Sequence, residues 1–176
     1  MRPLDANNDA HFREIYTETM PVLFKVAYRI AGSEEAAEDL CHDALIKMTE
    51  KEMKFPSVND AKYWLIRVVK NASLNYAKRK GRERRAYERA LKEDRRKMDS
   101  GETELLKSDT IDRVQNALDQ LPDNLRAVLH LKEYGELNYK EIGRVLGITE
   151  GNVKVRVFRA LEQLSKLIGA DDVYMP

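Results

Sequence analysis

The sequence predicts an all-α protein of two small helical domains joined by a flexible charged linker. Apolar residues recur at three- and four-residue spacing through most of the chain, and no segment shows the alternation of a half-buried strand. Only eight Gly and five Pro occur in 176 residues, which argues against many short strands and turns. Charged residues dominate only between 82 and 109, so the domains are expected to span 1–81 and 110–176.

The first domain is expected to contain three helices, at about 9–31, 34–50 and 61–80. Pro21 lies inside the first pattern and should kink that helix or divide it in two. Ser33 stands before two glutamates and is a good cap for the second helix. Asn59 or Asp60, at the end of a loop, can cap the third.

The linker, residues 82–109, is expected to be helical only at its start, because Ser100-Gly101 breaks any helix. Apolar periodicity then resumes at Ile111 and stops at Pro122. Further helices are expected from Leu125 to near Gly135, and over about 139–146 and 150–167.

Residues 139–158 have the layout of a helix-turn-helix. Asn138 can cap its first helix, and Glu141 can close a capping box with it. Gly143 is small where the second helix must cross closely, and Gly147 supplies the positive φ of a tight turn. The coincidence of these positions is typical of a DNA-binding unit.

The second helix of this unit is expected to be capped by Thr149 and to bury Val153 and Val157. A helix with exposed basic and amide side chains fits the major groove, where they read base edges and hold phosphates. The alternative is an ordinary helical hairpin with a solvated basic face. The predicted DNA-binding residues are Asn152, Lys154, Arg156, Phe158 and Arg159, with Val155 beside them.

A second group of aromatic, amide and basic residues follows the loop before the third helix. Rings of this kind stack on unpaired bases, amides bond base edges, and cations attract phosphates. Taken alone, Trp64 and Tyr76 at helical spacing are more typical of a packed core. The candidate residues for single-stranded DNA are Asn59, Tyr63, Trp64, Arg67, Asn71, Asn75, Lys78 and Arg79.

The helix over 34–50 carries a polar face, which alone is more typical of a solvated surface than of a partner site. Its residues are Glu38, Asp39, His42, Asp43 and Lys47, with Leu40 on the apolar stripe. Asp39, His42 and Asp43 share a face as possible metal ligands. The surroundings of the other two His residues do not repeat this pattern, as a di-metal bundle would require.

The remaining features exclude several classes of protein. Cys41 is the only cysteine, so neither an internal disulfide nor a cysteine metal cage can form. Cys41 and His42 are neighbours on a helix and point in different directions, which is unsuitable for a catalytic pair. No phosphate-binding glycine loop, signal peptide or membrane span is found. We therefore expect a cytoplasmic protein with no catalytic residue, metal, cofactor or membrane insertion.

The order of these pieces resembles the extracytoplasmic-function group of bacterial sigma factors. Residues 38–43 look like the Glu-Asp-Leu-x-Gln-Glu/Asp stretch of that family's region 2. Residues 63–67, with Asn71 and Asn75 behind them, look like its promoter-melting helix. Three stretches look like region 4 of the family: Leu121-Pro122 with Arg126, Tyr139 to Gly143, and Gly151 to Arg156.

The resemblance implies a role for each group. Glu38, Asp39, Leu40, His42, Asp43 and Lys47 would dock on the clamp of core RNA polymerase. The loop 55–62 and the helix 63–79 would take the minus-ten element, with one base flipped into a pocket of the loop, and would promote strand opening. The second helix of the helix-turn-helix would read the minus-thirty-five element, and the linker would run toward the RNA-exit channel. A membrane-linked anti-sigma factor is a further partner that the family implies.

Three positions depart from the family pattern. His42 stands where Gln is usual, Val155 where a small hydroxyl residue touches phosphate, and Asn152 where Thr or Ala is usual. They leave the promoter sequence open. The main rival interpretation is a stand-alone helix-turn-helix repressor whose N-terminal bundle serves dimerisation or ligand binding. An enzyme with a DNA-binding tail is a remote third.

Overall fold

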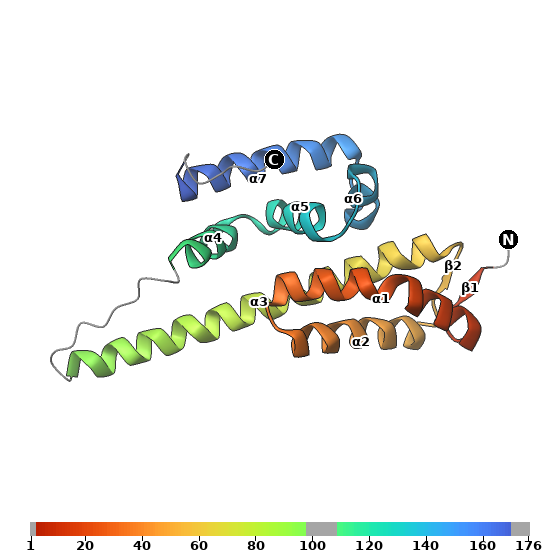
Figure 1. Ribbon diagram of the computed structural model, residues 1–176, viewed down its shortest axis with the longest axis horizontal. Coiled ribbons are helices and arrows are strands. Elements are labelled where there is room, and N and C mark those ends of the chain that lie inside the picture. The colour runs from red at the N-terminus through yellow and green to blue at the C-terminus, as the bar shows by residue number, and fades with distance from the viewer. Residues whose placement is uncertain (1–2, 98–108, 170–176) are drawn as a thin grey trace.

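The computed structural model describes residues 3–97 and 109–169, and over these ranges the predicted all-α architecture is confirmed. Figure 1 shows the helices in two layers, with α1, α2 and α3 below and α4 to α7 above. The elements in chain order are β1 (Leu4–Asp5), α1 (Asp9–Ala31), α2 (Glu34–Glu50), β2 (Lys54–Phe55), α3 (Val58–Lys97), α4 (Asp109–Gln120), α5 (Asp123–Tyr134), α6 (Tyr139–Leu146) and α7 (Glu150–Ile168).

A two-stranded sheet was not expected from the sequence. β1 and β2 pair antiparallel, with Leu4 opposite Phe55 and Asp5 opposite Lys54. The Ala6 amide extends the pairing by donating to the Met53 carbonyl at 2.9 Å. Strands of two residues are too short to show an alternating pattern, so periodicity could not reveal them. The sheet ties the N-terminal segment to the loop that precedes α3.

α1 runs without interruption through Pro21, so the helix is not divided there. Pro21 cannot donate to the Thr17 carbonyl, but tertiary packing on both sides of the proline maintains the helix. Leu23 and Ala27, after the proline, are fully buried, as is Ile15 before it. α1 packs along both α2 and α3 to form the N-terminal bundle.

α3 differs from the expectation at both ends. It begins at Val58 rather than near 61, and Ser57, not Asn59 or Asp60, provides the first polar contact: its Oγ accepts from the Asp60 amide at 3.3 Å. Asp60 completes the contact because its Oδ2 accepts from the Ser57 hydroxyl at 2.6 Å. The predicted cap was therefore wrong by two or three residues.

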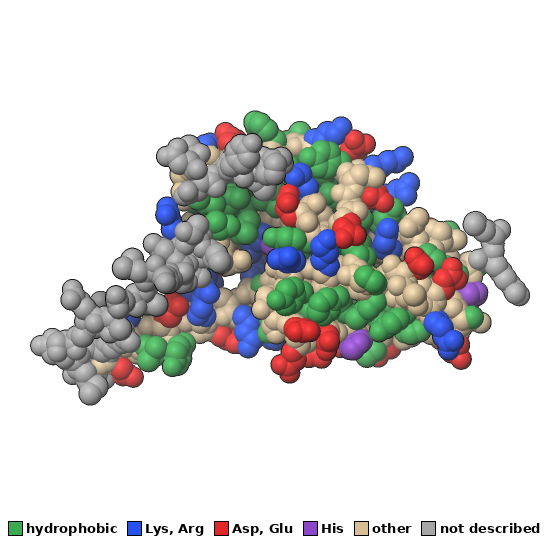
Figure 2. All heavy atoms as spheres, viewed as in Figure 1, with side chains coloured by type: hydrophobic (Ala, Val, Ile, Leu, Met, Phe, Trp, Pro, Cys, Tyr) green, Lys and Arg blue, Asp and Glu red, His purple; other side chains and the backbone are tan. Residues whose placement is uncertain are grey.

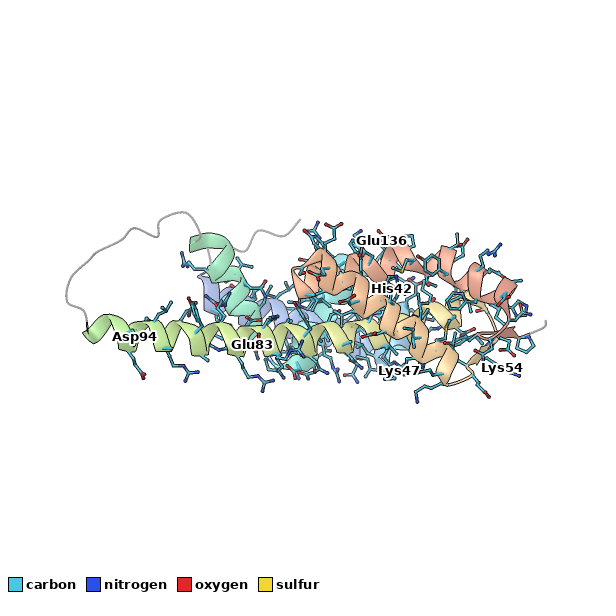
Figure 3. All side chains as sticks on the ribbon, turned by 90° about the horizontal axis from the view of Figure 1, so that it is seen from below. His42, Lys47, Lys54, Glu83, Asp94 and Glu136 are labelled. Carbon is cyan, nitrogen blue, oxygen red and sulfur yellow. The ribbon has the colours of Figure 1, made fainter. Side chains whose placement is uncertain are left out.

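At its other end α3 continues to Lys97, through much of the segment expected to be a flexible linker. Opposite charges one helical turn apart accompany the extension, with Lys80 and Arg79 beside Glu83 at 3.2 and 3.9 Å. Such pairs each add a few tenths of a kcal/mol to a helix. Figure 3 shows Glu83 and Asp94 along this extension, which projects beyond α1 and α2. Ser100-Gly101 lies outside the described residues.

The C-terminal helices pack on the N-terminal bundle. α5 lies against α1 and α6 lies against α3. One hydrophobic cluster includes Leu23 and Leu65 of the bundle together with Val128, Leu131 and Ile142 of the C-terminal helices. The linker pattern predicted two domains, but it did not reveal that their apolar surfaces meet.

Candidate nucleic-acid and polymerase interfaces

The helix-turn-helix forms as its sequence predicts. The Asn138 side chain accepts from the Glu141 amide at 3.0 Å, and the Glu141 carboxylate accepts from the Asn138 amide at 2.8 Å. Gly147 ends α6 with φ at 70°, in the left-handed region that favours glycine. Thr149 then caps α7, because its hydroxyl accepts from the Asn152 amide at 3.2 Å. These contacts fix the angle at which α7 leaves the turn.

Gly143 is required by the turn rather than by the body of the second helix. A Cβ atom at this position would lie 2.6 Å from the Ile148 carbonyl oxygen, which is part of the backbone. The expectation of a close approach was right, but the group that approaches is in the turn. Val153 and Val157 are both buried, so the inner face of α7 was also predicted correctly.

The outer face of α7 is largely open. Asn152, Lys154 and Arg159 are exposed, and Phe158 is 70% exposed. Arg156 differs, because it is half-buried and lines a cavity between the two layers. Four of the five predicted residues thus form one solvent-facing surface that could enter a groove of DNA.

Two side chains of α7, Lys154 and Val155, have further features. Lys154 pairs with Glu150 one turn earlier at 2.9 Å, and this hydrogen bond raises the pKa of Lys154. The ion pair holds the Lys154 ammonium group beside Glu150 on the surface of α7. Val155, 46% exposed, adds an apolar contact point beside Phe158.

The predicted single-strand surface on α3 is divided. Arg67, Asn71, Asn75 and Lys78 are exposed along one face. Tyr63 is only 8% exposed, and its hydroxyl donates to Glu141 Oε1 at 3.0 Å. Burial is also the main cause of the raised pKa of the Tyr63 phenol. Stacking of a base on this ring, as the sequence suggested, is excluded in this arrangement.

Trp64 is half-buried and packs on Phe55, with ring centroids 6.1 Å apart. The core interpretation therefore applies to Trp64 as well. Asn59 lies in the first turn of α3 at the rim of a hollow of about 420 Å³. Leu4, Pro56 and Glu18 also line this hollow, so the loop does form a recess next to the helix.

A second cavity, of about 440 Å³, lies between α3 and the C-terminal helices. Asn71, Asn75 and Lys78 line one side, and Asp123 and Arg126 line the other. Lys78 donates to Asp123 at 2.8 Å, and this hydrogen bond is the main cause of the lowered pKa of the Asp123 carboxyl.

Two charged residues at this cavity, Lys70 and Arg126, were not among the predicted site residues. Lys70 is 7% exposed, and burial lowers its pKa. Arg126 was noted only for its place in the family pattern; its guanidinium donates to the Asp119 and Leu121 carbonyls at 2.9 Å. Only the packing of the two layers brings these groups together, so no local pattern could have indicated that they line one cavity.

The polar face of α2 is exposed as predicted, with Leu40 half-buried. Glu38 and His42 border a groove of about 560 Å³ whose other wall is apolar, formed by Tyr16, Met20 and Phe24 of α1. Figure 2 shows hydrophobic side chains over α1 next to acidic side chains on α2, and Figure 3 places His42 and Lys47 on the outer surface of α2. An apolar groove with a charged rim suits a protein partner.

The remaining α2 residues face another direction. Asp39, Leu40 and Asp43 line a hollow whose far side is formed by Tyr76 and Arg79 of α3. The structure therefore brings Arg79, predicted to bind DNA, close to carboxylates predicted to bind polymerase. Five of the six predicted docking residues thus lie at two adjoining surfaces rather than one, and the sixth, Lys47, is exposed on the same helix.

The rest of the described chain offers little for chemistry. No group of three or more His, Cys, Asp or Glu that could hold a metal ion occurs among these residues. Cys41 is buried, and burial raises the pKa of its thiol to about 12, so it is a poor nucleophile. Over the same residues, no helix combines the length and apolarity needed to cross a membrane.

Two family models match the chain in the order of its two layers. Sigma-70 region 2 matches residues 15–83, and Sigma-70 region 4 matches residues 111–164. Region 2 thus covers the bundle from α1 to the middle of α3. Region 4 covers α4 to α7, including the helix-turn-helix.

Curated relatives agree with these matches. The ECF RNA polymerase sigma factor SigE of Mycolicibacterium smegmatis is 32% identical over 148 residues, which are 81% of this chain and 55% of that protein. The chain therefore spans about half the length of that relative. SigW of Bacillus subtilis, another ECF RNA polymerase sigma factor, is 28% identical over 155 residues, 82% of this chain and 81% of SigW.

Solved structures share the fold. CnrH in complex with the cytosolic domain of CnrY has a TM-score of 0.62 and 22% identity, covering 95% of this chain and 93% of CnrH. The sigma factor RpoE of Bartonella quintana, in complex with the anti-sigma factor NepR, has a TM-score of 0.54 and 23% identity, covering 91% and 98%. With both regions matched in order on the corresponding layers, the chain belongs to the extracytoplasmic-function group of the sigma-70 family.

Proposed function

We propose that this chain binds core RNA polymerase, directs it to specific promoters and promotes opening of the DNA strands. The observation that carries the proposal is the presence of two different DNA-suited surfaces in one chain, on α7 and on α3, each within the matching sigma region. A helix-turn-helix alone would support only duplex binding. The second surface, with its amides and cations, is suited to unpaired bases.

Region 4 would read the minus-thirty-five element through Asn152, Lys154, Phe158 and Arg159, with Arg156 at the edge of the site. Amide and guanidinium groups on an exposed helix can bond base edges in the major groove. Lys154 would hold phosphate, and this contribution should weaken as salt increases.

Region 2 would hold the minus-ten element along Arg67, Asn71, Asn75, Lys78 and Arg79. The hollow beside Asn59 is large enough to suggest a place for one flipped base, and it lies at the start of the same helix. Binding of unpaired bases stabilises the open DNA relative to the duplex. Nucleotide addition remains the chemistry of polymerase, so this chain acts as a regulatory factor in the cytoplasm, where polymerase works, and not as an enzyme.

The exposed face of α2 and the groove beside it would form the polymerase-docking surface. We expect Asp39→Ala combined with His42→Ala to weaken binding of core polymerase about tenfold, because both sides of α2 lose a polar contact. Glu50→Ala, at the exposed end of the same helix, is the matched control and should bind as the wild type does. Wild-type affinity for core enzyme in the double variant would remove this face from the docking site.

An anti-sigma factor is a further proposed partner. NepR, bound to the related RpoE, is called an anti-sigma factor, and that relative shares the fold of this chain. Such a partner would compete with polymerase for the same surfaces. In the presence of the anti-sigma factor, this chain would therefore retain less core polymerase in a pull-down.

The stand-alone repressor is not favoured, because it gives no reason for a complete sigma region 2 over residues 15–83. The two functions differ in one measurement. An initiation factor retains purified core polymerase in a pull-down and starts transcription with it. A repressor binds duplex DNA tightly by itself and ignores the polymerase.

A further inference from the structure

The cavity of about 440 Å³ between α3 and the C-terminal helices is lined by more cations than carboxylates. Lys70 and Lys78 come from α3, Arg126 comes from α5 and Arg156 from α7. Among the lining residues that the structure describes, Asp123 is the only carboxylate. Asp123 already accepts from Lys78 at 2.8 Å and lies 3.5 Å from the Arg126 guanidinium. The cavity therefore keeps an excess of positive charge.

Lys70 carries the most deeply placed of these charges. Its side chain is 7% exposed, and within residues 3–97 and 109–169 its ammonium group has neither a hydrogen-bond acceptor nor an ion pair. Burial lowers the pKa of Lys70, and the Arg67 charge lowers it further. A buried charge without a hydrogen bond is costly to a fold. An anion in the cavity would offset this cost.

Arg126 adds a second buried donor without an acceptor. It is 7% exposed, and one terminal guanidinium nitrogen donates to the Asp119 and Leu121 carbonyls at 2.9 Å. The other terminal nitrogen lies 3.7 Å from the Asp119 carboxylate. The Nε of Arg126 is buried and has no acceptor in the described part of the chain. Two cations at this cavity are thus more than nine-tenths buried and incompletely bonded.

The N-terminus of α5 lies at the same wall. α5 begins after Pro122, which makes no side-chain cap hydrogen bond. The first amides of a helix lack acceptors within the helix, and the helix dipole is positive at this end. Asp123 and Asn124, from the first turn, both line the cavity. An uncapped helix N-terminus beside buried cations is an arrangement that suits phosphate.

The enclosure of these groups favours a small ligand over a nucleic-acid backbone. Figure 1 shows α5 between α7 and the lower layer, and the cavity has walls from α3, α5 and α7. Its volume falls within the range of about 300–1,000 Å³ that is typical of small-molecule sites. Leu74 and Leu146 add apolar surface. One phosphate group carries only about 1.5 to 2 negative charges at neutral pH, so two linked phosphates match several cations better than one.

We propose that this cavity binds a small molecule that carries a diphosphate group, held by Lys70, Arg126 and Arg156 and by the first-turn amides of α5. Inorganic pyrophosphate and a nucleoside diphosphate share this chemistry. In a nucleoside diphosphate the organic part would lie against Leu74 and Leu146, with the Asn124 amide as a polar partner. The inference does not depend on the proposed function, because the cavity and its charges exist whether or not the chain reads promoters.

The first experiment is calorimetric titration of the full chain with sodium pyrophosphate, with adenosine diphosphate, and with sulfate at matched ionic strength. Pyrophosphate should bind about tenfold or more tightly than sulfate, because it reaches cations on several helices at once. Binding of adenosine diphosphate more tightly than pyrophosphate would identify a nucleotide as the ligand. The reverse order would identify the inorganic anion. Pyrophosphate should also raise the unfolding temperature of the chain.

Lys70→Met tests the buried ammonium without changing the size of the side chain much. The variant should bind pyrophosphate about tenfold more weakly, as expected for the loss of a charge-assisted hydrogen bond. Without ligand it should unfold at the same or a higher temperature than the wild type, because a costly buried charge has been removed. Lys92→Met, on the exposed part of α3, makes the same change in net charge and should bind as the wild type does.

Asn124→Asp provides a second variant whose fold is expected to be intact. Asn124 is exposed in the first turn of α5, where a carboxylate is favourable to the helix. The added negative charge should nevertheless weaken pyrophosphate binding about threefold to tenfold. Loss of binding in a variant with a stable helix would place the anion at this wall.

The proposal is overturned if pyrophosphate binds no more tightly than sulfate, or if Lys70→Met binds it as the wild type does. Transcription with core polymerase separates this site from DNA binding. Lys70→Met should support transcription at the wild-type level without added ligand. An equal loss of transcription and of pyrophosphate binding would mean that Lys70 serves DNA, and would also overturn the proposal. Failure of the wild-type chain to start transcription would instead reject the proposed function and leave this site in place.

Discussion

The two DNA-suited helices of this chain differ in how they meet solvent. α7 presents its reading face outward, and its central aromatic, Phe158, is 70% exposed. On α3 only part of the face contacts region 4: Tyr63 is buried, and Arg67, although exposed, is bonded to α6. Both helices carry basic and amide side chains in similar density. The difference shows that residue type indicates what a surface can bind, while tertiary packing decides which of its side chains stay accessible.

The same contrast appears in what holds each surface in place. The α7 surface depends on contacts within twenty residues: a capping box, a left-handed glycine and a threonine cap. The α3 surface depends on contacts between residues far apart, such as Lys78 with Asp123. Changes to the turn should therefore strongly reduce the stability of the α7 unit. Changes at the α3 face should have smaller effects on stability and binding.

The largest expected effect is on the turn before α7. Gly143→Val should destabilise the fold by about 3 kcal/mol, because its side chain would meet the Ile148 carbonyl oxygen, which cannot move aside cheaply. Urea unfolding provides the measurement. Gly151→Ala is the matched control, since nothing lies within 4 Å of its new methyl group, and should be neutral or stabilise by up to about 1 kcal/mol. Equal stability of the two variants would mean that the turn does not require Gly143.

The next effect concerns the pH dependence of stability. His130 of α5 is 6% exposed, and burial, with Arg126 nearby, lowers its pKa to about 4. The unfolded chain binds the proton at an ordinary pKa of about 6.5. The stabilising contribution is thus fully present above pH 6.5 and is lost as the pH falls toward 4.

Lowering the pH from 8 to 5 should cost about 2 kcal/mol of unfolding free energy through His130. Carboxylates contribute their own pH dependence, so the measurement is the difference between wild type and His130→Leu, each unfolded in urea across this range. The unfolding free energy of the variant should fall less steeply as the pH is lowered, because the contribution of His130 is missing. Parallel curves would show that His130 is protonated equally in both states.

The local elements could be predicted from the sequence because their causes are local. The bounds of α2 and α6, the cap at Ser33 and the turn at Gly147 each follow from residues within a few positions. The end of α3 could not be found in this way. A charged segment with few apolar residues is typical of a linker, yet pairs such as Lys80 with Glu83 also suit a helix, and composition does not separate the two.

The candidate site shows the same limit. Exposure of Asn152, Lys154 and Arg159 on α7 was predicted from helical spacing. Burial of Tyr63 was not, because Glu141, its partner, is 78 residues away in the sequence. Helical periodicity describes one helix at a time, so it does not identify which other element covers a face.

A smaller effect, on promoter binding, is expected at the exposed face of α7. Arg159→Ala should weaken binding of the polymerase complex to its minus-thirty-five element about tenfold, in keeping with about 1–3 kcal/mol for a base contact. Arg156→Ala should also weaken it, but Arg156 is half-buried beside the cavity and would alter the packing of the two layers as well. Gln163→Ala, one turn beyond Arg159 and exposed, serves as the control. Promoter binding unchanged in both Arg variants would place the reading face elsewhere on α7.

The smallest effect, at the α3 surface, should distinguish strand opening from initial docking on duplex DNA. Asn71→Ala and Asn75→Ala should each slow strand separation about fivefold, because each removes one amide that can bond an unpaired base, worth about 1 kcal/mol. Initial docking on duplex should change less. Lys78→Ala should instead weaken initial docking more than it slows strand separation, since phosphate attraction depends on salt and not on base pairing.

A premelted bubble template separates these roles, because it supplies the unpaired bases without the cost of opening. The Asn variants should recover most of their transcription on the bubble relative to wild type, whereas Lys78→Ala should not. Asn124→Ala is the matched control, as its amide lines the opposite wall of the same cavity but belongs to region 4. If the Asn variants remain equally impaired on the bubble, the amides either read bases after opening or act through the fold. Thermal unfolding decides between these two, because only a loss of stability would lower the melting temperature.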